Sequence, residues 1–317
     1  MNFVEDFKEH IFDKNDETFE DSSLALFDFQ YHNNQIYQRY CKQLGIMAKA
    51  VQKVDQIPFL PIEFFKTHEV SSSYKAVQKV FKSSGTTAGQ RSKHCMSDLG
   101  FYEQISQQIF EGLLGEISQY TLIALLPSYL EQGDSSLIYM VDHFIKKCKE
   151  GSGYYLEKDI ATIIAESENP MLFGVSYALL DMPSVQYEDL LIIETGGMKG
   201  RKKEITREEL HNEIRRKTEA SNIWSEYGMT ELTSQAYGTN GTFSFPAWAT
   251  VLIREVNDPF SYQEQGKTGA LNIIDLANVE SCAFIETKDL GIIQEAKNFK
   301  VLGRLDNSDL RGCNLLV

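Results

Sequence analysis

The chain has 317 residues, of which 42% are hydrophobic and 24% charged, a composition typical of a globular protein with a sizeable core. Its 31 Lys and Arg against 45 Asp and Glu give a net charge of −14, which disfavours nucleic acid and anionic membranes as partners. The acidic N-terminus is no signal peptide and no apolar run reaches spanning length, so we expect a cytoplasmic protein without an integral membrane segment.

The predicted elements alternate in type after a helical lead-in. Residues 1 to about 50 have apolar residues at helical spacing, and two prolines then mark residues 57–65 as extended or turned. Residues 77–94 indicate a strand that runs into a loop rich in Gly, Ser and Thr. The alternation that follows predicts an α/β fold with mixed sheets flanked by helices. We expect helices at 98–115, 135–149 and 206–219, strands at 120–127, 170–176, 189–197, 221–228 and 269–275, and a final strand that ends in a polar loop.

The strongest local signal is the segment SSGTTAGQ at 83–90. Its glycines let the backbone turn, and successive N–H groups in such a turn form an anion nest. Arg91, Lys93 and His94 follow, and they could add charge toward a phosphate tail. A Walker pattern is absent, so a plain flexible loop is the alternative. The residues predicted to bind phosphate are Ser83, Ser84, Gly85, Thr86, Thr87 and Gly89.

A second signal is the segment SEYGMTELTS at 225–234, which follows a predicted strand. Tyr227 offers an aromatic face that suits adenine, and Gly228 allows a tight turn. Thr230 can donate a hydrogen bond to a phosphate, and Glu231 is a hard oxygen ligand suited to Mg²⁺. The alternative is the start of a helix, with Thr230 as its cap and Glu231 in its first turn.

Together the two segments resemble motifs of the adenylate-forming superfamily, which includes acyl-CoA synthetases, luciferases and peptide-synthetase adenylation domains. Two more motifs follow in the family's order. TKDLG at 287–291 is similar to the T-G-D segment, with Lys288 where glycine is usual, and GRLD at 303–306 is similar to the G-R-x-D hinge motif. Within the superfamily, the chain looks most like the acyl-protein synthetase branch, the fatty-acid activating type of bacterial bioluminescence (LuxE-like).

The resemblance implies a domain organisation. Residues 1–302 would form the large N-terminal domain of the adenylate-forming fold, including the helical lead-in, and residues 303–317 the hinge motif and a short tail. The family's small C-terminal domain, which carries an adenylating lysine, is expected to be absent.

The resemblance also implies how ATP is bound. Asp289 and Arg304 would hold the ribose, and adenine would lie near Tyr227 and a glycine-containing loop at 194–200. Glu231 would bind Mg²⁺ and, with Thr230, take part in catalysis. The residues assigned to ATP beyond the phosphate loop are Gly197, Tyr227, Gly228, Asp289 and Arg304.

A cysteine is the expected acyl acceptor. The five cysteines are odd in number and form no C-x-x-C pair, which predicts reduced thiols. In the acyl-protein synthetase branch a cysteine near the C-terminus accepts the acyl group, and Cys313 matches it. Arg311 lies two residues away and would favour the thiolate. Cys95 is the internal rival and Cys282 reads as a core residue, while Cys313 could instead be a free thiol in a terminal segment.

The predicted function is ATP-dependent activation of a carboxylic acid, with a fatty acid expected, to an acyl-adenylate, followed by transfer to Cys313. ATP and Mg²⁺ are the implied cofactors, and a fatty-acyl reductase is the implied partner. Two alternatives remain, an acid–CoA ligase resembling the phenylacetate type, with CoA as the thiol, and a non-catalytic nucleotide-binding protein. Candidate side chains for an apolar acid pocket, each of which could equally pack the core, are Phe101, Tyr129, Phe173 and Tyr177.

Overall fold

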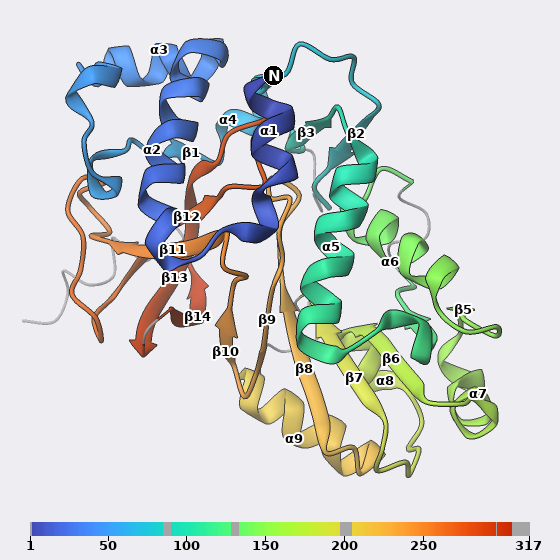
Figure 1. Ribbon diagram of the computed structural model, residues 1–317. Helices are drawn as coiled ribbons and strands as arrows, with labels where there is room; N and C mark the ends of the chain where they lie inside the picture. The colour runs from blue at the N-terminus through green and yellow to red at the C-terminus, as the bar shows by residue number, and fades with distance from the viewer. Residues whose placement is uncertain (1, 85–89, 128–132, 197–204, 296, 306–317) are drawn as a thin grey trace, which may run out of the picture.

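A large mixed β-sheet runs through the molecule and is flanked by helices (Figure 1). The computed structural model describes residues 2–84, 90–127, 133–196, 205–295 and 297–305. Within these residues the sheet has 12 strands, in the order β11-β12-β13-β14-β10-β9-β8-β7-β6-β4-β5, with β1 paired to β13. Strands β2 and β3 form a separate sheet of 2 strands. The predicted α/β class with mixed sheets is confirmed.

The elements follow one another along the chain with short connections. The helices are α1 Phe3–Glu9, α2 Asp16–Asn33, α3 Gln35–Gln43, α4 Phe64–Thr67, α5 Leu99–Leu114, α6 Ser136–Lys147, α7 Ile160–Glu166, α8 Ser176–Asp181 and α9 Arg207–Thr218. The strands are β1 Leu60–Pro61, β2 Lys79–Lys82, β3 Lys93–Met96, β4 Thr121–Leu125, β5 Gly153–Tyr154, β6 Pro170–Val175, β7 Leu191–Thr195, β8 Asn222–Tyr227, β9 Ala236–Thr239, β10 Thr242–Ser244, β11 Ala249–Arg254, β12 Thr268–Asp275, β13 Phe284–Glu295 and β14 Asn298–Arg304.

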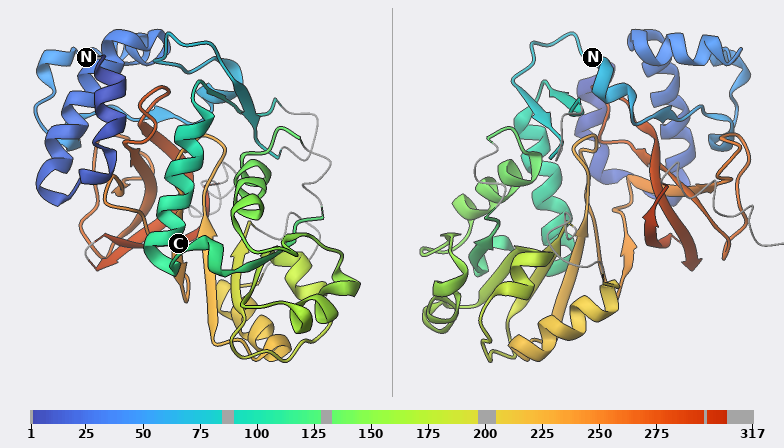
Figure 2. Two further views of the ribbon diagram at one scale, coloured as in Figure 1. Left: turned by 45° about the vertical axis from the view of Figure 1, so that its right-hand side comes forward. Right: turned by 180° about the vertical axis from the view of Figure 1, so that it is seen from behind.

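The sheet changes character at β8. From β5 to β8 all neighbours are parallel, whereas β9 to β14 pair antiparallel. Every residue of β4, β6 and β7 is buried, as expected for parallel strands covered on both faces. Helices α5 and α6 cover one face of this half, and α8 and α9 cover the other (Figures 1 and 2).

Side-chain caps explain why the predicted helices begin where they do. Thr206 and Glu209 form a capping box at the start of α9, and Asn15 forms another with Thr18 at the start of α2. Asp98 caps α5 by accepting from the Phe101 N–H. These caps satisfy amide donors that would otherwise lack partners in the first turn. In the described part of the chain, none of the helices has the length and apolarity that a membrane span requires.

The N-terminal helices pack against the antiparallel half of the sheet. Phe284 of β13 is fully buried, and the rings of Phe27 and Tyr37 lie against it, with centroids 6.2 and 6.1 Å away. Gln30 on α2 reaches across to the β12–β13 connection, where its amide donates to the carbonyl oxygens of Asn278 and Val279.

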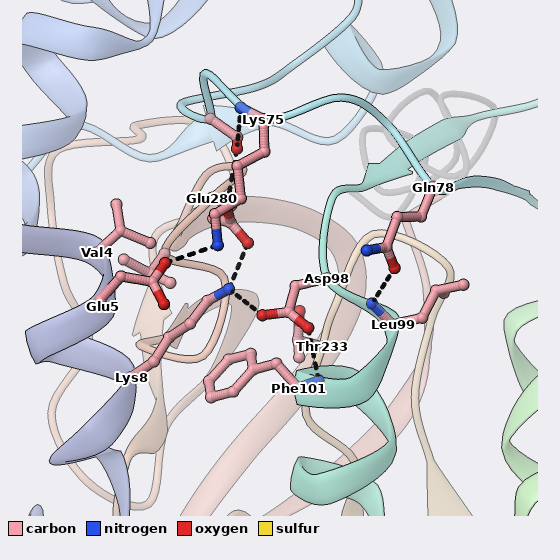
Figure 3. Close-up of polar contacts among 12 residues, drawn as sticks. Val4, Glu5, Lys8, Lys75, Gln78, Asp98, Leu99, Phe101, Thr233 and Glu280 are labelled. Carbon is pink, nitrogen blue, oxygen red and sulfur yellow. Dashed lines mark hydrogen bonds and ion pairs between the residues drawn. The ribbon is translucent and has the colours of Figure 1, made fainter. Parts of the chain in front are cut away.

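A buried lysine joins α1 to the rest of the fold (Figure 3). Lys8 Nζ lies 2.8 Å from Asp98 at the cap of α5 and 2.5 Å from Glu280 in the β12–β13 connection. A second ion pair, of 2.6 Å, joins Lys75 to Glu5. Three segments far apart in the sequence therefore meet at one cation, and loss of that cation would leave two carboxylates facing each other.

Candidate active site

The predicted phosphate loop leaves and re-enters the fold through the β2–β3 pair. The Ser83 N–H donates to the Ser92 carbonyl at 3.1 Å, and the Ser92 N–H donates to the Ser83 hydroxyl at 3.0 Å. These bonds close the base of the loop, so Ser83 has a structural partner as well as its predicted ligand. Ser84, the last residue that the structure describes before the loop, is half-buried. The loop residues Gly85, Thr86, Thr87 and Gly89 lie outside the described residues.

The prediction that Arg91 adds charge toward the phosphates needs a correction. Its guanidinium makes two bonds to Asp134, of 3.1 and 2.8 Å, and also donates to the carbonyl oxygens of Ser83 and Lys82. Because a bidentate pair with a carboxylate occupies this planar group, Arg91 anchors the base of the loop rather than facing a phosphate. His94 is buried, as described below, and Lys93 is exposed.

The segment around Glu231 forms a turn, so the alternative of a helix start is wrong. Strand β8 ends at Tyr227, residues 230–231 turn, and the chain returns as β9 beside β8. The Leu232 N–H donates to the Met229 carbonyl at 3.1 Å. A Cβ at Gly228 would meet a carboxylate oxygen of Glu226, so a larger residue here would require that side chain to shift.

Glu231 is held in a buried position, with 5% of its surface exposed. Burial raises the pKa of its carboxyl group, and the Ser92 hydroxyl, the Arg304 charge and the Lys66 charge oppose that effect. Its carbonyl accepts from the Asn278 amide at 2.8 Å. Among the described residues no group of three or more His, Cys, Asp or Glu could hold a metal ion. A cation at Glu231 would therefore depend on oxygens from a ligand.

Tyr227, Asp289 and Arg304 come together although 62 residues separate the first two. The Tyr227 hydroxyl donates to Asp289 Oδ2 at 2.7 Å, and Arg304 Nε lies 3.3 Å from Asp289 Oδ1. Asp289 and Arg304 are direct partners in the β13–β14 register. Successive side chains along β13 point to opposite faces of the sheet, so Lys288 points away from Asp289 and pairs with Glu63. The lysine in the T-K-D segment thus points away from the Asp289 carboxylate, which is itself buried.

Aromatic side chains surround Tyr227. The rings of Phe243 and Phe299 lie 5.7 Å from the Tyr227 ring, and Phe245 lies 6.4 Å away. Burial, followed by the Asp289 charge, raises the pKa of Tyr227 well above its usual range. Tyr227 is therefore a neutral donor held in place by packing, and the second residue assigned to adenine, Gly197, lies outside the described residues.

Loss of the Asp289 carboxylate should weaken ATP binding if this cluster holds the ribose. We expect Asp289→Ala to raise the KM for ATP at least about tenfold, because each hydrogen bond to a charged group contributes about 1.5–3 kcal/mol. Steady-state pyrophosphate exchange at varied ATP measures this. Asp21→Ala, at an exposed position on α2, is the matched control. An unchanged KM in a folded Asp289→Ala protein would remove Asp289 from the site.

Two buried carboxylates beside the site were missed by sequence reasoning. Glu194 of β7 accepts from the Ser176 hydroxyl at 2.5 Å and from Arg207 at 2.7 Å. Burial alone would raise the pKa of Glu194, but these bonds, together with His211, outweigh it and lower the pKa. Burial raises the pKa of Glu226 to about 7. The sequence did carry a signal for them, because Glu194 and Glu226 are each a single acidic residue near the end of an apolar strand.

The side chains predicted for an acid pocket are mostly buried. Phe101, Phe173 and Tyr177 are at most 8% exposed, and Tyr129 lies outside the described residues. Phe173 is in the middle of β6, where both faces of the sheet are covered, so it packs in the core. Phe101 lines a small pocket together with Lys8 and Asp98.

Comparison with solved structures gives the fold, which is that of the adenylate-forming enzymes. An open conformation of 2-hydroxyisobutyryl-CoA ligase, in complex with 2-HIB-AMP and CoA, matches with a TM-score of 0.66 and 11% identity over 90% of this chain and 74% of that chain. The O-succinylbenzoate coenzyme A synthetase of Bacillus subtilis, in complex with ATP and magnesium ion, matches with a TM-score of 0.54 and 19% identity over 73% of this chain and 51% of that one. The chain spans about half the length of several such structures.

Sequence comparison finds similarity to one branch of these enzymes, the acyl-protein synthetases. The family model for "Acyl-protein synthetase, LuxE" matches residues 3–107. The long-chain-fatty-acid–luciferin-component ligase of Vibrio harveyi is 21% identical over 336 residues, which cover 92% of this chain and 85% of that protein. The predicted resemblance to the acyl-protein synthetases is thereby confirmed.

Proposed function

We propose that this chain activates a carboxylic acid with ATP to form an acyl-adenylate and passes the acyl group to a thiol. The observation that carries the proposal is the Tyr227–Asp289–Arg304 cluster, which lies on an adenylate-forming fold next to the turn that bears Glu231. A carboxylate flanked by a neutral hydroxyl and a guanidinium can accept from the two hydroxyls of a ribose.

The residues present fit ATP with Mg²⁺. Glu231 is a single buried carboxylate whose pKa is raised by burial, and a divalent cation would favour its ionised form. Bound Mg²⁺ would neutralise the phosphate oxygens. The chain's own part is to hold Glu231 through Asn278 and to close the phosphate loop through Ser83 and Ser92.

The first half-reaction then needs positioning and charge stabilisation. An oxygen of the substrate carboxylate attacks the α-phosphorus of ATP, and the bond to pyrophosphate breaks. Backbone N–H groups of residues 84–90 and the Thr230 hydroxyl are the donors proposed to meet the phosphates.

For the second half-reaction we propose Cys313 as the acceptor. Its thiolate would attack the acyl carbonyl, and AMP would leave. Cys313 lies outside the described residues, so the support comes from the other four cysteines. Burial raises the pKa of each, to about 12 for Cys41 and Cys148, so they are poor nucleophiles. This argues against the internal rival Cys95, which is 7% exposed.

The substrate and partner follow from the family match as proposals. The name of the Vibrio harveyi relative makes a long-chain fatty acid the acid to test first. We propose a fatty-acyl reductase as the partner that receives the acyl group, and the cytoplasm as the location. CoA is the thiol to test if no acyl-protein forms.

Labelled fatty acid, ATP and Mg²⁺ should give acid-dependent pyrophosphate exchange and a hydroxylamine-labile label on the protein. Cys313→Ala should abolish the label and leave exchange within about twofold, because adenylation precedes transfer to the thiol. Cys148→Ala is the control, with both signals retained. The readouts are exchange rate and label per chain.

The other outcomes decide between the alternatives. A stable label on the Cys313→Ala protein would show that Cys313 is not the acceptor. Exchange with product formation only when CoA is added would favour the acid–CoA ligase. If the protein binds ATP but shows no pyrophosphate exchange with any of a panel of fatty and aromatic acids, it is a non-catalytic nucleotide-binding protein.

A further inference from the structure

The strand that leaves the phosphate loop also contacts the turn that bears Glu231. Ser92 immediately precedes β3 and His94 is its second residue, so the two side chains face the same side, and each is only 2% exposed. His94 Nδ1 lies 2.8 Å from the carbonyl oxygen of Thr230. The Ser92 hydroxyl lies beside the Glu231 carboxylate, where it favours the ionised form.

His94 acts as a neutral hydrogen-bond donor. Burial lowers its pKa to about 4, and the Thr230 carbonyl only partly opposes that shift. A carbonyl oxygen can only accept, so Nδ1 carries the proton. The Phe65 ring of α4 meets the imidazole edge-on, with centroids 5.9 Å apart, and fixes its plane.

Separate bonds hold the far side of the same turn. Asn278 donates to the Glu231 carbonyl at 2.8 Å, and Asp275 accepts from the N–H groups of Thr233 and Ser234 at 2.9 and 2.8 Å. These residues belong to β12 and the connection after it. The turn is therefore bonded to the sheet on one side and, through His94, to the strand leaving the phosphate loop on the other.

We propose that His94 is a positioning residue, which fixes the Thr230–Glu231 turn relative to the base of the phosphate loop at Ser83 and Ser92, so that one Mg²⁺–ATP can meet both. The inference rests on the proposed function. It assigns His94 no proton transfer, because a neutral donor bonded to a backbone carbonyl has no proton to exchange at neutral pH. Its role is the distance between two ligand-binding segments, to which small displacements matter strongly.

The test compares variants that keep or remove the donor. Asparagine can place its amide N–H near the position of Nδ1, whereas leucine fills the space without a donor. We expect His94→Leu to weaken Mg²⁺–ATP binding about tenfold by titration calorimetry, since a buried carbonyl loses its partner and the turn can shift. ATP binding in EDTA should change less than threefold, and His94→Asn should stay within threefold in both conditions.

Activity adds a second readout. In pyrophosphate exchange, His94→Leu should raise the KM for Mg²⁺–ATP and the Mg²⁺ concentration at half-maximal rate, and leave the KM for the acid unchanged. Ser92→Ala should move the Mg²⁺ dependence in the same direction by a smaller factor. If His94→Leu does not fold, His94→Gln, which moves the donor by one methylene, replaces it with the same expectation.

The outcomes separate this inference from the proposed function. Equal losses of thermal stability in the Leu and Asn variants, with unchanged Mg²⁺–ATP binding, would make His94 merely structural and overturn the inference. Binding of Mg²⁺–ATP without exchange for any acid would reject the proposed function, while the binding comparison would still decide the role of His94. No Mg²⁺–ATP binding by the unmodified chain would overturn both.

Discussion

Glu231→Gln should lower Mg²⁺-dependent pyrophosphate exchange by about a hundredfold or more, the largest activity loss that we expect from one substitution. Glutamine keeps the size and packing of the side chain but removes the negative charge that a divalent cation requires. Loss of one charge-stabilising group in an enclosed site typically costs about 10²–10³ in rate. Exchange measured against Mg²⁺ concentration should show a lower maximum and a weaker apparent affinity for the metal.

The same substitution should leave the fold intact. Burial raises the pKa of Glu231, so its charge is a cost to the folded state, and a neutral amide should not lower the melting temperature at pH 7. Glu69→Gln, at an exposed position, is the matched control and should keep full exchange. Full activity of a folded Glu231→Gln protein would show that this carboxylate does not bind the metal.

Glu226→Gln should stabilise the protein at pH 8 by up to roughly 3 kcal/mol, the energy that corresponds to the gap between 4.5 and about 7. In the unfolded chain Glu226 ionises near its ordinary value of 4.5, whereas in the folded protein it keeps its proton up to about pH 7. Between these values the folded state binds more protons, so the free energy of unfolding falls as pH rises through this window and levels off above it.

On the neighbouring strand, the pKa of Glu194 is shifted in the opposite direction. Its pKa is lowered, so its ionised form stabilises the folded state above pH 4.5 and this contribution is lost as pH falls. Glu194→Gln should therefore destabilise the protein at pH 8, since it leaves Arg207 without its carboxylate. Urea unfolding of both variants at pH 5 and pH 8 measures the differences. A Glu226→Gln protein that is less stable than the unmodified chain at pH 8 would contradict the assignment.

The sequence allowed prediction of elements with a strong local signal. Helix α9 has both members of its capping box in the sequence, and β6 and β7 are apolar runs of strand length. Strand β13 was not predicted over its full length, because the polar TKD segment interrupts its apolar pattern. The short β9 and β10 were missed too, since their pairing depends on the turn between them more than on composition.

The site was predictable as far as its motifs reach. Tyr227, Asp289 and Arg304 were named from the order of the motifs, and the register of β13 with β14 explains how two of them meet. The partners of those motifs were not predictable. His94 was expected to carry charge, but burial beneath the Thr230 turn makes it neutral, and burial depends on contacts 136 residues away.

The pairing of β1 with β13 has a consequence for synthesis on the ribosome. Leu60 lies opposite Ile285, and Gln30 bonds to a carbonyl 248 residues later, so the first third of the chain packs on strands made near the end. At about 5–20 residues per second, the apolar faces of α2 and α3 wait roughly 10–50 s for their partners. During that interval a nascent chain has to be shielded from aggregation, and pairing between segments so distant in sequence forms slowly in general.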